Sequence, residues 1–179
     1  MEDVLLDIKG NTERCVIRKL GEEETCLLDD FLYEAIFIPQ GVRPPERDII
    51  LRPELRVYTE GFGDRTGDNC LVADIGGRVV GAVWTRIMND YGHVDDETPS
   101  FAISLYKEYR GLGLGTRLMS RMLECLRAQG YKRASLAVQK ANYAVKMYEK
   151  VGFKKVDENE EEYIMVCELK PSSTLLEAT

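Results

Sequence analysis

The alternation of apolar and polar residues in the N-terminal third predicts one strand, one helix and a proline-rich loop. Residues 15–20 (CVIRKL) mix β-branched and charged residues, as a short strand does, and Gly21 ends the run. Over residues 22–38, apolar residues recur every three or four positions after an acidic start, which predicts an amphipathic helix. Prolines crowd residues 39–53, so we expect a loop there, with a short helical turn at 46–51.

The clearest hairpin signal lies in the middle of the chain. Two apolar runs, 70–75 and 79–88, are separated by Gly76-Gly77, a pair that can adopt the positive φ angles of a tight turn. Polar loops precede and follow this hairpin at 60–69 and 89–100. Loops of this kind often carry substrate specificity.

The clearest helix covers residues 114–129. An apolar stripe runs along one side and charged residues occupy the other, and Gly130 stands where a C-terminal glycine is expected. The stripe consists of Leu114, Leu118, Met119, Met122, Leu123, Cys125 and Leu126.

The remaining apolar runs complete a mixed α/β pattern. They are strands at 101–106, 134–138, 153–156 and 163–169, and a helix at 141–150. The order of elements predicts a mixed sheet with helices on its faces. The length suits a single domain over residues 1–170, and we expect a flexible tail over 171–179.

Composition excludes several classes of protein. Hydrophobic residues make up 44% and charged residues 31%, as in ordinary globular proteins. The net charge of −7 opposes nucleic-acid binding, which draws most of its affinity from phosphate contacts. Five scattered cysteines and a single histidine, His93, argue against a disulfide framework and a metal site.

The N-terminal residues do not resemble a targeting signal. They are acidic where a secretory signal is basic, and no apolar stretch reaches the roughly 18 residues that cross a bilayer. We therefore expect a cytoplasmic protein that does not bind membranes.

One segment carries the candidate chemistry. Residues 110–116 (RGLGLGT) lie between a predicted strand and a predicted helix, so their backbone N–H groups converge at a helix N-terminus. Glycines at 111, 113 and 115 allow close backbone approach to a ligand. This arrangement favours a pyrophosphate site, although a simple glycine-rich connector is the alternative.

Two other phosphate-binding motifs do not fit this segment. A dinucleotide fingerprint requires G-x-G-x-x-G and a later acidic residue, whereas the spacing here is G-x-G-x-G and the next strand ends in Gln139-Lys140. A Walker loop requires Gly-Lys-Ser/Thr, whereas Thr116 and Arg117 follow Gly115.

Residues 110–115 instead match the R-x-x-G-x-G/A motif of the GNAT superfamily of acyl-CoA N-acyltransferases. A second block, residues 142–153 (NYAVKMYEKVGF), resembles the following helix of that family. The resemblance implies a GNAT-like mixed, mostly antiparallel twisted sheet of about six to seven strands with about four flanking helices. It also implies a V-shaped splay between the two central strands.

The resemblance further implies acetyl-CoA as cosubstrate, with no metal. Its pyrophosphate would bind the glycine loop, and its pantetheine arm would lie between the strands at 101–106 and 134–138. The implied cofactor-binding residues are Ile103, Ser104, Leu105, Arg110, Gly111, Leu112, Gly113, Leu114, Gly115, Thr116, Asn142 and Lys146. For Lys146, a solvated helix charge is an equally good interpretation.

The resemblance assigns an acid but leaves the base open. Tyr148 matches the family tyrosine that protonates the departing thiolate, although it could also simply pack its ring. Many members carry an acidic residue near the start of the strand before the glycine loop, where this chain has Ser100 after a proline. Asp96, Glu97 and His93 are the nearest substitutes, unless they form only a solvated loop.

The predicted function is acetyl transfer from acetyl-CoA to a primary amine by direct attack in a ternary complex. The alternative is a non-catalytic acyl-CoA-binding module, and a nucleic-acid-binding regulator is disfavoured by the charge. The acceptor would be a small-molecule or peptide amine, and acidic residues in the loops favour a cationic one. Homodimers are common in the family.

Overall fold

The computed structural model describes residues 2–8 and 10–170, and the predicted tail at 171–179 lies outside them. The strands are β1 (Glu2–Ile8), β2 (Asn11–Lys19), β3 (Asn69–Ile75), β4 (Arg78–Arg86), β5 (Ser100–Leu105), β6 (Arg133–Gln139), β7 (Lys154–Glu158) and β8 (Glu162–Glu168). The α-helices are α1 (Leu27–Ala35), α2 (Pro53–Arg56), α3 (Leu114–Ala128) and α4 (Ala144–Lys150). Short 3₁₀ helices are η1 (Glu22–Glu24), η2 (Arg47–Leu51) and η3 (Lys107–Tyr109).

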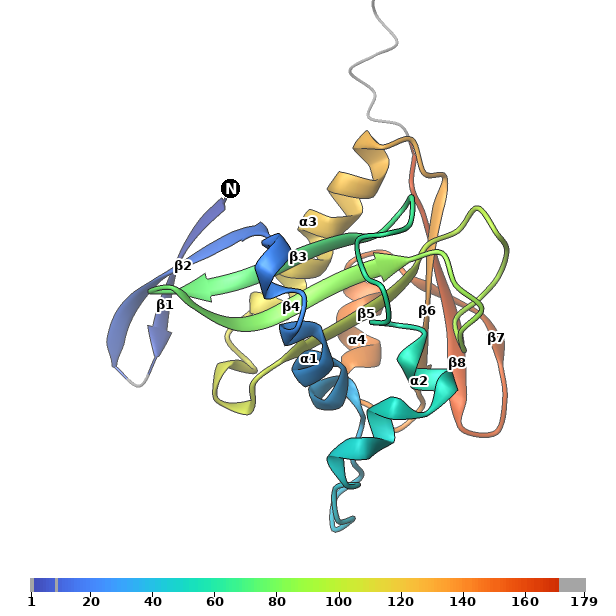
Figure 1. Ribbon diagram of the computed structural model, residues 1–179, viewed down its shortest axis with the longest axis horizontal. Coiled ribbons are helices and arrows are strands. Elements are labelled where there is room, and N and C mark those ends of the chain that lie inside the picture. The colour runs from blue at the N-terminus through green and yellow to red at the C-terminus, as the bar shows by residue number, and fades with distance from the viewer. Residues whose placement is uncertain (1, 9, 171–179) are drawn as a thin grey trace, which may run out of the picture.

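The described strands form one sheet in the order β1-β2-β3-β4-β5-β6-β8-β7 (Figure 1). Every neighbouring pair is antiparallel except β5 and β6, which are parallel. The predicted fold class, a mixed and mostly antiparallel sheet with helices on its faces, is therefore confirmed. The sheet has eight strands over the described residues, more than the six to seven expected.

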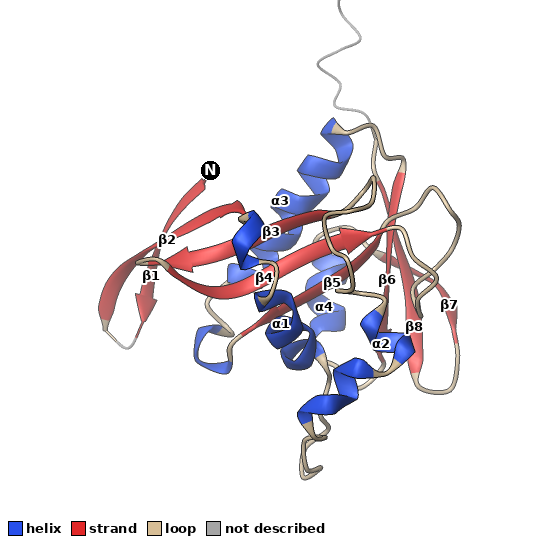
Figure 2. Cartoon of the chain, in the orientation of Figure 1, coloured by secondary structure: helices blue, strands red, loops and turns tan. Residues whose placement is uncertain are grey.

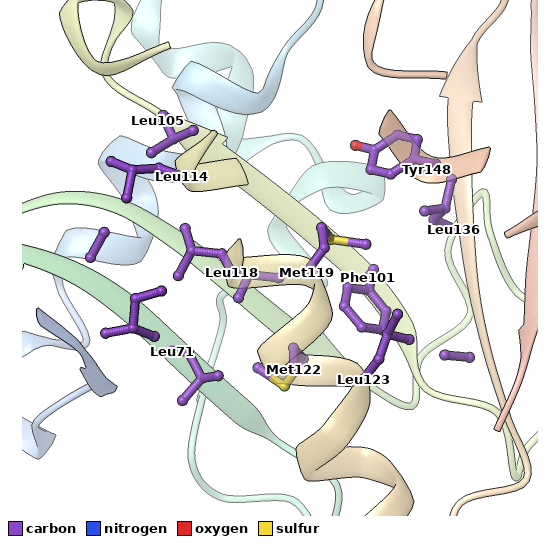
Figure 3. Close-up of a cluster of buried hydrophobic side chains, with 14 of the residues drawn as sticks. Leu71, Phe101, Leu105, Leu114, Leu118, Met119, Met122, Leu123, Leu136 and Tyr148 are labelled. Atoms are coloured by element: carbon purple, nitrogen blue, oxygen red, sulfur yellow. The ribbon is translucent and has the colours of Figure 1, made fainter. Parts of the chain in front are cut away.

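Helices cover both faces of the sheet: α1 and α2 on one side, α3 and α4 on the other (Figure 2). The larger apolar cluster fills the α3 side, where Leu118, Met122 and Leu123 of α3 are buried with Leu71 and Phe101 (Figure 3). A second cluster, including Phe31 and Trp84, lies under α1. The predicted apolar stripe of residues 114–129 thus faces the sheet.

The N-terminal hairpin was not predicted in full. Strand β1 pairs antiparallel with β2, and Val4 and Leu6 are buried while Leu5 is 74% exposed. This period of two is the strand signature, but the acidic residues around it obscure it. Gly10 has a φ of +84° close to the turn, a conformation that favours glycine.

The helix predicted over residues 22–38 divides into η1 and α1. The Glu24 side chain accepts hydrogen bonds from Gly21 N–H (2.7 Å) and from Arg18, which fixes a tight turn before the helix. Helix α1 ends at Ala35 because Pro39 disfavours helical backbone in the residues before it. The predicted turn at 46–51 is η2, and α2, which begins at Pro53, was missed.

Strands β5 and β6 separate soon after they meet. Their only register pair within the described sheet is Ser100 with Ser135, fixed by Ser135 N–H donating to the Pro99 carbonyl (3.0 Å). Because backbone polar groups alternate sides along a strand, those of Ile103 and Leu105 point toward β6 without being paired to it. The predicted V-shaped splay is therefore present.

The part of the chain that the structure describes contains no helix with both the length and the apolarity that a membrane span requires. All five cysteines are free; Cys26 is exposed, Cys125 is half-buried, and the other three are buried.

Candidate active site

A cavity of about 810 Å³ opens where α1, the end of β5, the start of α3 and α4 converge. The glycine-rich segment and the β5–β6 splay contribute to the same space. Ten of the residues predicted for the site line it: Ile103, Ser104, Leu105, Arg110, Gly111, Gly113, Gly115, Thr116, Asn142 and Tyr148.

The glycine loop forms the N-terminal end of α3. Gly111 and Gly113 have φ angles of 79° and 81°, and a Cβ on either would meet nothing within 4 Å, so backbone conformation is what favours glycine there. A Cβ on Gly115 would lie 3.0 Å from Met147 Sδ, so that glycine lets α3 approach α4.

The first turn of α3 presents unpaired N–H groups. Its first hydrogen bond runs from Arg117 N–H to the Gly113 carbonyl (3.2 Å), which leaves the N–H groups of Leu114, Gly115 and Thr116 without an intrahelical acceptor. The helix dipole adds partial positive charge at this end. Together they form a site suited to a phosphate group.

Three residues of the glycine loop have side chains that are not available to a ligand. Leu114 is fully buried and Leu112 packs against the core, so only their backbones can serve a ligand. The Arg110 guanidinium donates to the Leu105 carbonyl (2.9 Å) and to Glu34 Oε2 (3.0 Å). Arg110 therefore ties the loop to β5 and α1, and its charge is already paired.

The strand wall of the cavity is mainly backbone. Ile103 and Leu105 turn their polar groups toward the opening between β5 and β6, as described above. The Ser104 hydroxyl instead donates to the Phe31 carbonyl (2.6 Å) of α1. Ser104 thus lines the cavity, but its side chain holds α1 in place.

Helix α4 supplies the opposite wall. The Asn142 Oδ1 accepts the Ala144 N–H (2.9 Å) at the start of the helix, and the Asn142 amide nitrogen has no partner among the described residues. This nitrogen can donate to a ligand. Lys146 is exposed and does not line the cavity.

Tyr148 presents its hydroxyl to the cavity from α4. The residue is 9% exposed and its ring packs on Phe153, with 6.2 Å between ring centroids. Figure 3 shows the hydroxyl pointing away from Leu136, and no described residue hydrogen-bonds to it. Burial raises the pKa of Tyr148, so the hydroxyl keeps its proton at neutral pH and can act as a donor.

The three predicted substitutes for the base lie away from the cavity. The Asp96 side chain is 99% exposed, Glu97 is also exposed, and the His93 Nδ1 is 2.9 Å from the Met88 carbonyl. Their loop turns outward because Asp95 accepts the Glu97 N–H and pairs with Arg133. The structure does not bring these three residues together with Tyr148.

A different carboxylate was missed by the sequence reasoning. Asp90 Oδ2 accepts hydrogen bonds from the Tyr58 hydroxyl (2.6 Å) and the Ser100 hydroxyl (2.7 Å), and Oδ1 is enclosed without a partner among the described residues. The only sequence signal for this site was Ser100, which stands where many family members carry an acidic residue. Within residues 2–8 and 10–170, no three His, Cys, Asp or Glu side chains are grouped as a metal site requires.

Known proteins resemble this chain in sequence. The chain is 38% identical over 87 residues to the probable N-acetyltransferase camello of Xenopus tropicalis, covering 47% of this chain and 37% of that protein. It is 36% identical over 62 residues to the ribosomal protein bS18-alanine N-acetyltransferase of Haemophilus influenzae, covering 35% and 42%. The aligned part is thus less than half the length of either relative.

A solved structure shares the fold. The PaiA N-acetyltransferase of Thermoplasma acidophilum, crystallised in complex with coenzyme A, superimposes with a TM-score of 0.64 at 18% identity. The match covers 86% of this chain and 98% of that one. Residues 33–153, more than half of the chain, match the model of the acetyltransferase (GNAT) family. The chain therefore belongs to the GNAT acetyltransferase family.

Proposed function

We propose that this protein transfers the acetyl group of acetyl-CoA to a primary amine in a ternary complex. The observation that carries the proposal is the single cavity in which the glycine loop, the β5–β6 splay and the Tyr148 hydroxyl meet. A phosphate site, an open strand edge and a proton donor are the three features that this reaction needs from the protein.

The residues of the cavity suit acetyl-CoA. The unpaired N–H groups at the start of α3 suit its pyrophosphate. The open backbone of Ile103 and the Leu105 N–H suit the amide-containing pantetheine arm, which would add to β5 as a neighbouring strand does, while the Leu105 carbonyl already accepts from Arg110. The Asn142 amide nitrogen is a further donor on the facing wall.

The chemistry follows from these positions. The amine nitrogen, once deprotonated, attacks the thioester carbon, and a backbone N–H of β5 stabilises the oxyanion of the tetrahedral intermediate. Collapse breaks the C–S bond, and the sulfur leaves as a thiol by taking a proton from Tyr148. Tyr148 regains a proton from the nitrogen, which ends as a neutral amide.

The cavity does not favour a polycationic acceptor. Its one acidic lining residue, Glu34, is paired with Arg110, and Lys107 lies nearby. Of the loops whose acidic residues favoured a cationic amine in the sequence, 60–69 and 89–100 contribute no described lining residue, and 39–53 contributes only the apolar Val42 and Pro44. Its outer wall is apolar: Ile36, Phe37, Ile38, Val42 and Pro44. We therefore propose an acceptor that carries no positive charge besides its amine, such as a peptide N-terminus.

Thermal unfolding with and without acetyl-CoA tests the cosubstrate. A ligand that binds only the folded state raises the midpoint, and an unchanged midpoint at millimolar acetyl-CoA would refute the proposal. Thiol release is then measured with four acceptors: a peptide with N-terminal alanine, Nα-acetyl-lysine, spermidine and an aminoglycoside. A raised midpoint without thiol release for any of them would favour the non-catalytic module.

A matched pair of glycine variants separates binding from folding. Gly113→Ala and Gly130→Ala both place a Cβ at positive φ, 81° and 86°, with nothing within 4 Å, at opposite ends of α3. Each should lower the free energy of unfolding by about 1 kcal/mol. Only Gly113→Ala should weaken coenzyme A binding, measured by calorimetry; equal affinities would argue against the phosphate site.

A matched pair of tyrosine variants tests the acid. Tyr148→Phe should lower kcat by roughly 10²-fold while leaving coenzyme A affinity unchanged, because the ring packing is preserved. Tyr163→Phe is the control, since Tyr163 lies on β8 outside the cavity. Equal kcat for the two variants would remove Tyr148 from the mechanism.

A further inference from the structure

Asp90 is a carboxylate held among hydroxyl groups with no cation. Tyr58 and Ser100 both donate to Oδ2, at 2.6 and 2.7 Å, and no Lys, Arg or His of the described chain forms an ion pair with Asp90. Oδ1 is enclosed and has no partner there. Enclosed polar atoms are nearly always hydrogen-bonded, so Oδ1 is an acceptor that can take one further donor.

The carboxylate lies at the closed end of the β5–β6 splay. Ser100 and Ser135 are the residues at which these strands pair, and Ser135 Oγ is a second enclosed polar atom without a described partner. Gly92 closes the loop over them, since a Cβ there would lie 2.7 Å from Ser100 Oγ and 2.8 Å from Ala137 N. The two hydroxyls lie on the same face of the sheet as neighbouring side chains.

The titratable groups around Asp90 are tyrosines and a glutamate. Besides Tyr58, the titratable groups nearby are Glu162 of β8 and Tyr91 of the same loop. Burial and the negative charge of Asp90 raise the pKa of Tyr58, and burial, Glu161 and Asp90 raise that of Glu162. None of these groups supplies positive charge, so a proton is the cation that this site can accept.

We propose that Asp90, acting through Ser100 and Ser135, receives the proton that the acceptor amine must lose before it attacks. Ser100 is three residues from Ile103, about 10 Å along β5, so Asp90 does not touch the reacting atoms and is a positioning residue. The inference rests on the proposed acetyl transfer. It assigns to Asp90 the role of proton acceptor, which the sequence left open because Ser100 stands where many family members carry an acidic residue.

The protons balance with this assignment. The ammonium form of the substrate gives one proton to the Asp90 carboxylate, and the freed lone pair forms the C–N bond. After the C–S bond breaks, the second proton of the nitrogen replaces the one that Tyr148 gave to sulfur. Asp90 returns its proton to solvent after the amide leaves, and the enzyme is restored.

The test is the pH profile of Asp90→Asn, measured as kcat/KM for acetyl-CoA-dependent thiol release with the panel amine that the wild type uses best. At neutral pH we expect a deficit of roughly 10²-fold. The deficit should narrow as the pH approaches the pKa of the amine, because the free base needs no proton acceptor. A deficit of the same size at every pH would overturn the proposal.

Two further variants keep the test decisive. Asp95→Asn removes a carboxylate that pairs with Arg133 in the same loop, and we expect its pH profile to follow the wild type. Ser100→Ala keeps the carboxylate and removes the hydroxyl, and we expect a smaller deficit with the same pH dependence. If Asp90→Asn does not unfold cooperatively, Ser100→Ala becomes the deciding variant. A wild-type pH profile of kcat/KM for Ser100→Ala would refute the inference. A wild type without turnover would refute the proposed function instead.

Discussion

Two aspartates, one just before β3 and one between β4 and β5, have opposite kinds of hydrogen-bond partner. Asp68 pairs with Arg86 at 2.7 Å, and their side chains are 1% and 0% exposed. Arg86 also donates to the carbonyls of Val57, Glu60 and Gly61, so its donors are used. Asp90 has two hydroxyl donors, no cation among the described residues and one unpartnered oxygen.

The difference separates a carboxylate that stabilises the fold from one that we propose acts in the reaction. Neutralising Asp68 would leave the Arg86 charge buried without compensation, so this carboxylate cannot change protonation cheaply. Neutralising Asp90 would leave no buried cation without a partner, because its partners are the hydroxyls of Tyr58 and Ser100. Burial by itself therefore does not indicate a role; the partners of the buried group do.

The largest effect should follow from breaking the ion pair. Asp68→Asn keeps the shape of the side chain but leaves Arg86 unpaired, which should lower the free energy of unfolding by about 3–5 kcal/mol. Urea unfolding at neutral pH measures the loss. The folded variant should keep the wild-type pH profile of kcat/KM, and a changed profile would show that the two aspartates are not separable in this way.

Acid should weaken the same pair. Burial acts to raise the pKa of Asp68, but hydrogen bonds from Arg86 and the Gly63 N–H outweigh it, and the net pKa is lowered. A lowered folded-state pKa gives stability that is present above the unfolded pKa of about 3.9 and lost as the pH falls through the folded value. The stability gap between wild type and Asp68→Asn should therefore close below about pH 4.

A control for acid sensitivity comes from an exposed aspartate. The Asp96 side chain is 99% exposed and its contact with His93 spans 3.7 Å, so Asp96→Asn should change the free energy of unfolding far less than Asp68→Asn does. A gap between wild type and Asp68→Asn that stays constant from pH 7 to pH 3 would contradict the pairing.

Tyr58→Phe should have a smaller effect on stability and a specific one on activity. It removes one hydrogen bond to an enclosed carboxylate, worth about 1–3 kcal/mol in the free energy of unfolding. With one donor fewer, the Asp90 carboxylate is held less firmly, so kcat/KM at neutral pH should fall.

Thr59→Val is the matched control for Tyr58→Phe. The Thr59 hydroxyl also lies 2.7 Å from an aspartate oxygen, but that of Asp29 in α1 instead of Asp90. Its removal should cost stability without lowering kcat/KM at neutral pH. An equal fall in kcat/KM in both variants would argue that the activity reports on loop stability instead.

The sequence predicted the parts of this molecule that depend on local pattern. The helix predicted at 114–129 is α3, and the hairpin around Gly76-Gly77 joins β3 to β4. Strong apolar periodicity and a glycine turn act over a few residues, so they can be recognised without the rest of the chain. The glycine loop was located for the same reason.

The Asp90 site depends on contacts that no local pattern encodes. Tyr58 and Asp90 are 32 residues apart, and Ser100 is 10 residues beyond Asp90. Asp96 and Glu97 are nearer to Ser100 in sequence than Asp90 is, although the fold turns Asp96 into solvent. The cytoplasmic location and the flexible tail at 171–179 stay predictions.

Ser135 Oγ and Thr85 Oγ1 are equally buried hydroxyls, and neither has a partner among the described residues. The neighbours of Thr85 on β4, Trp84 and Arg86, donate to the backbone around Tyr58, so Thr85 faces the opposite side of the sheet from Asp90.

Ser135→Ala and Thr85→Val should both change the free energy of unfolding by no more than about 1 kcal/mol, since neither hydroxyl has a partner to lose. Only Ser135 lies beside Ser100, so only Ser135→Ala should lower kcat/KM at neutral pH, by at most about tenfold. The deficit should vanish as the pH rises, as for Asp90→Asn. Equal activity in the two variants would remove Ser135 from the proton path and leave Ser100 as its single hydroxyl.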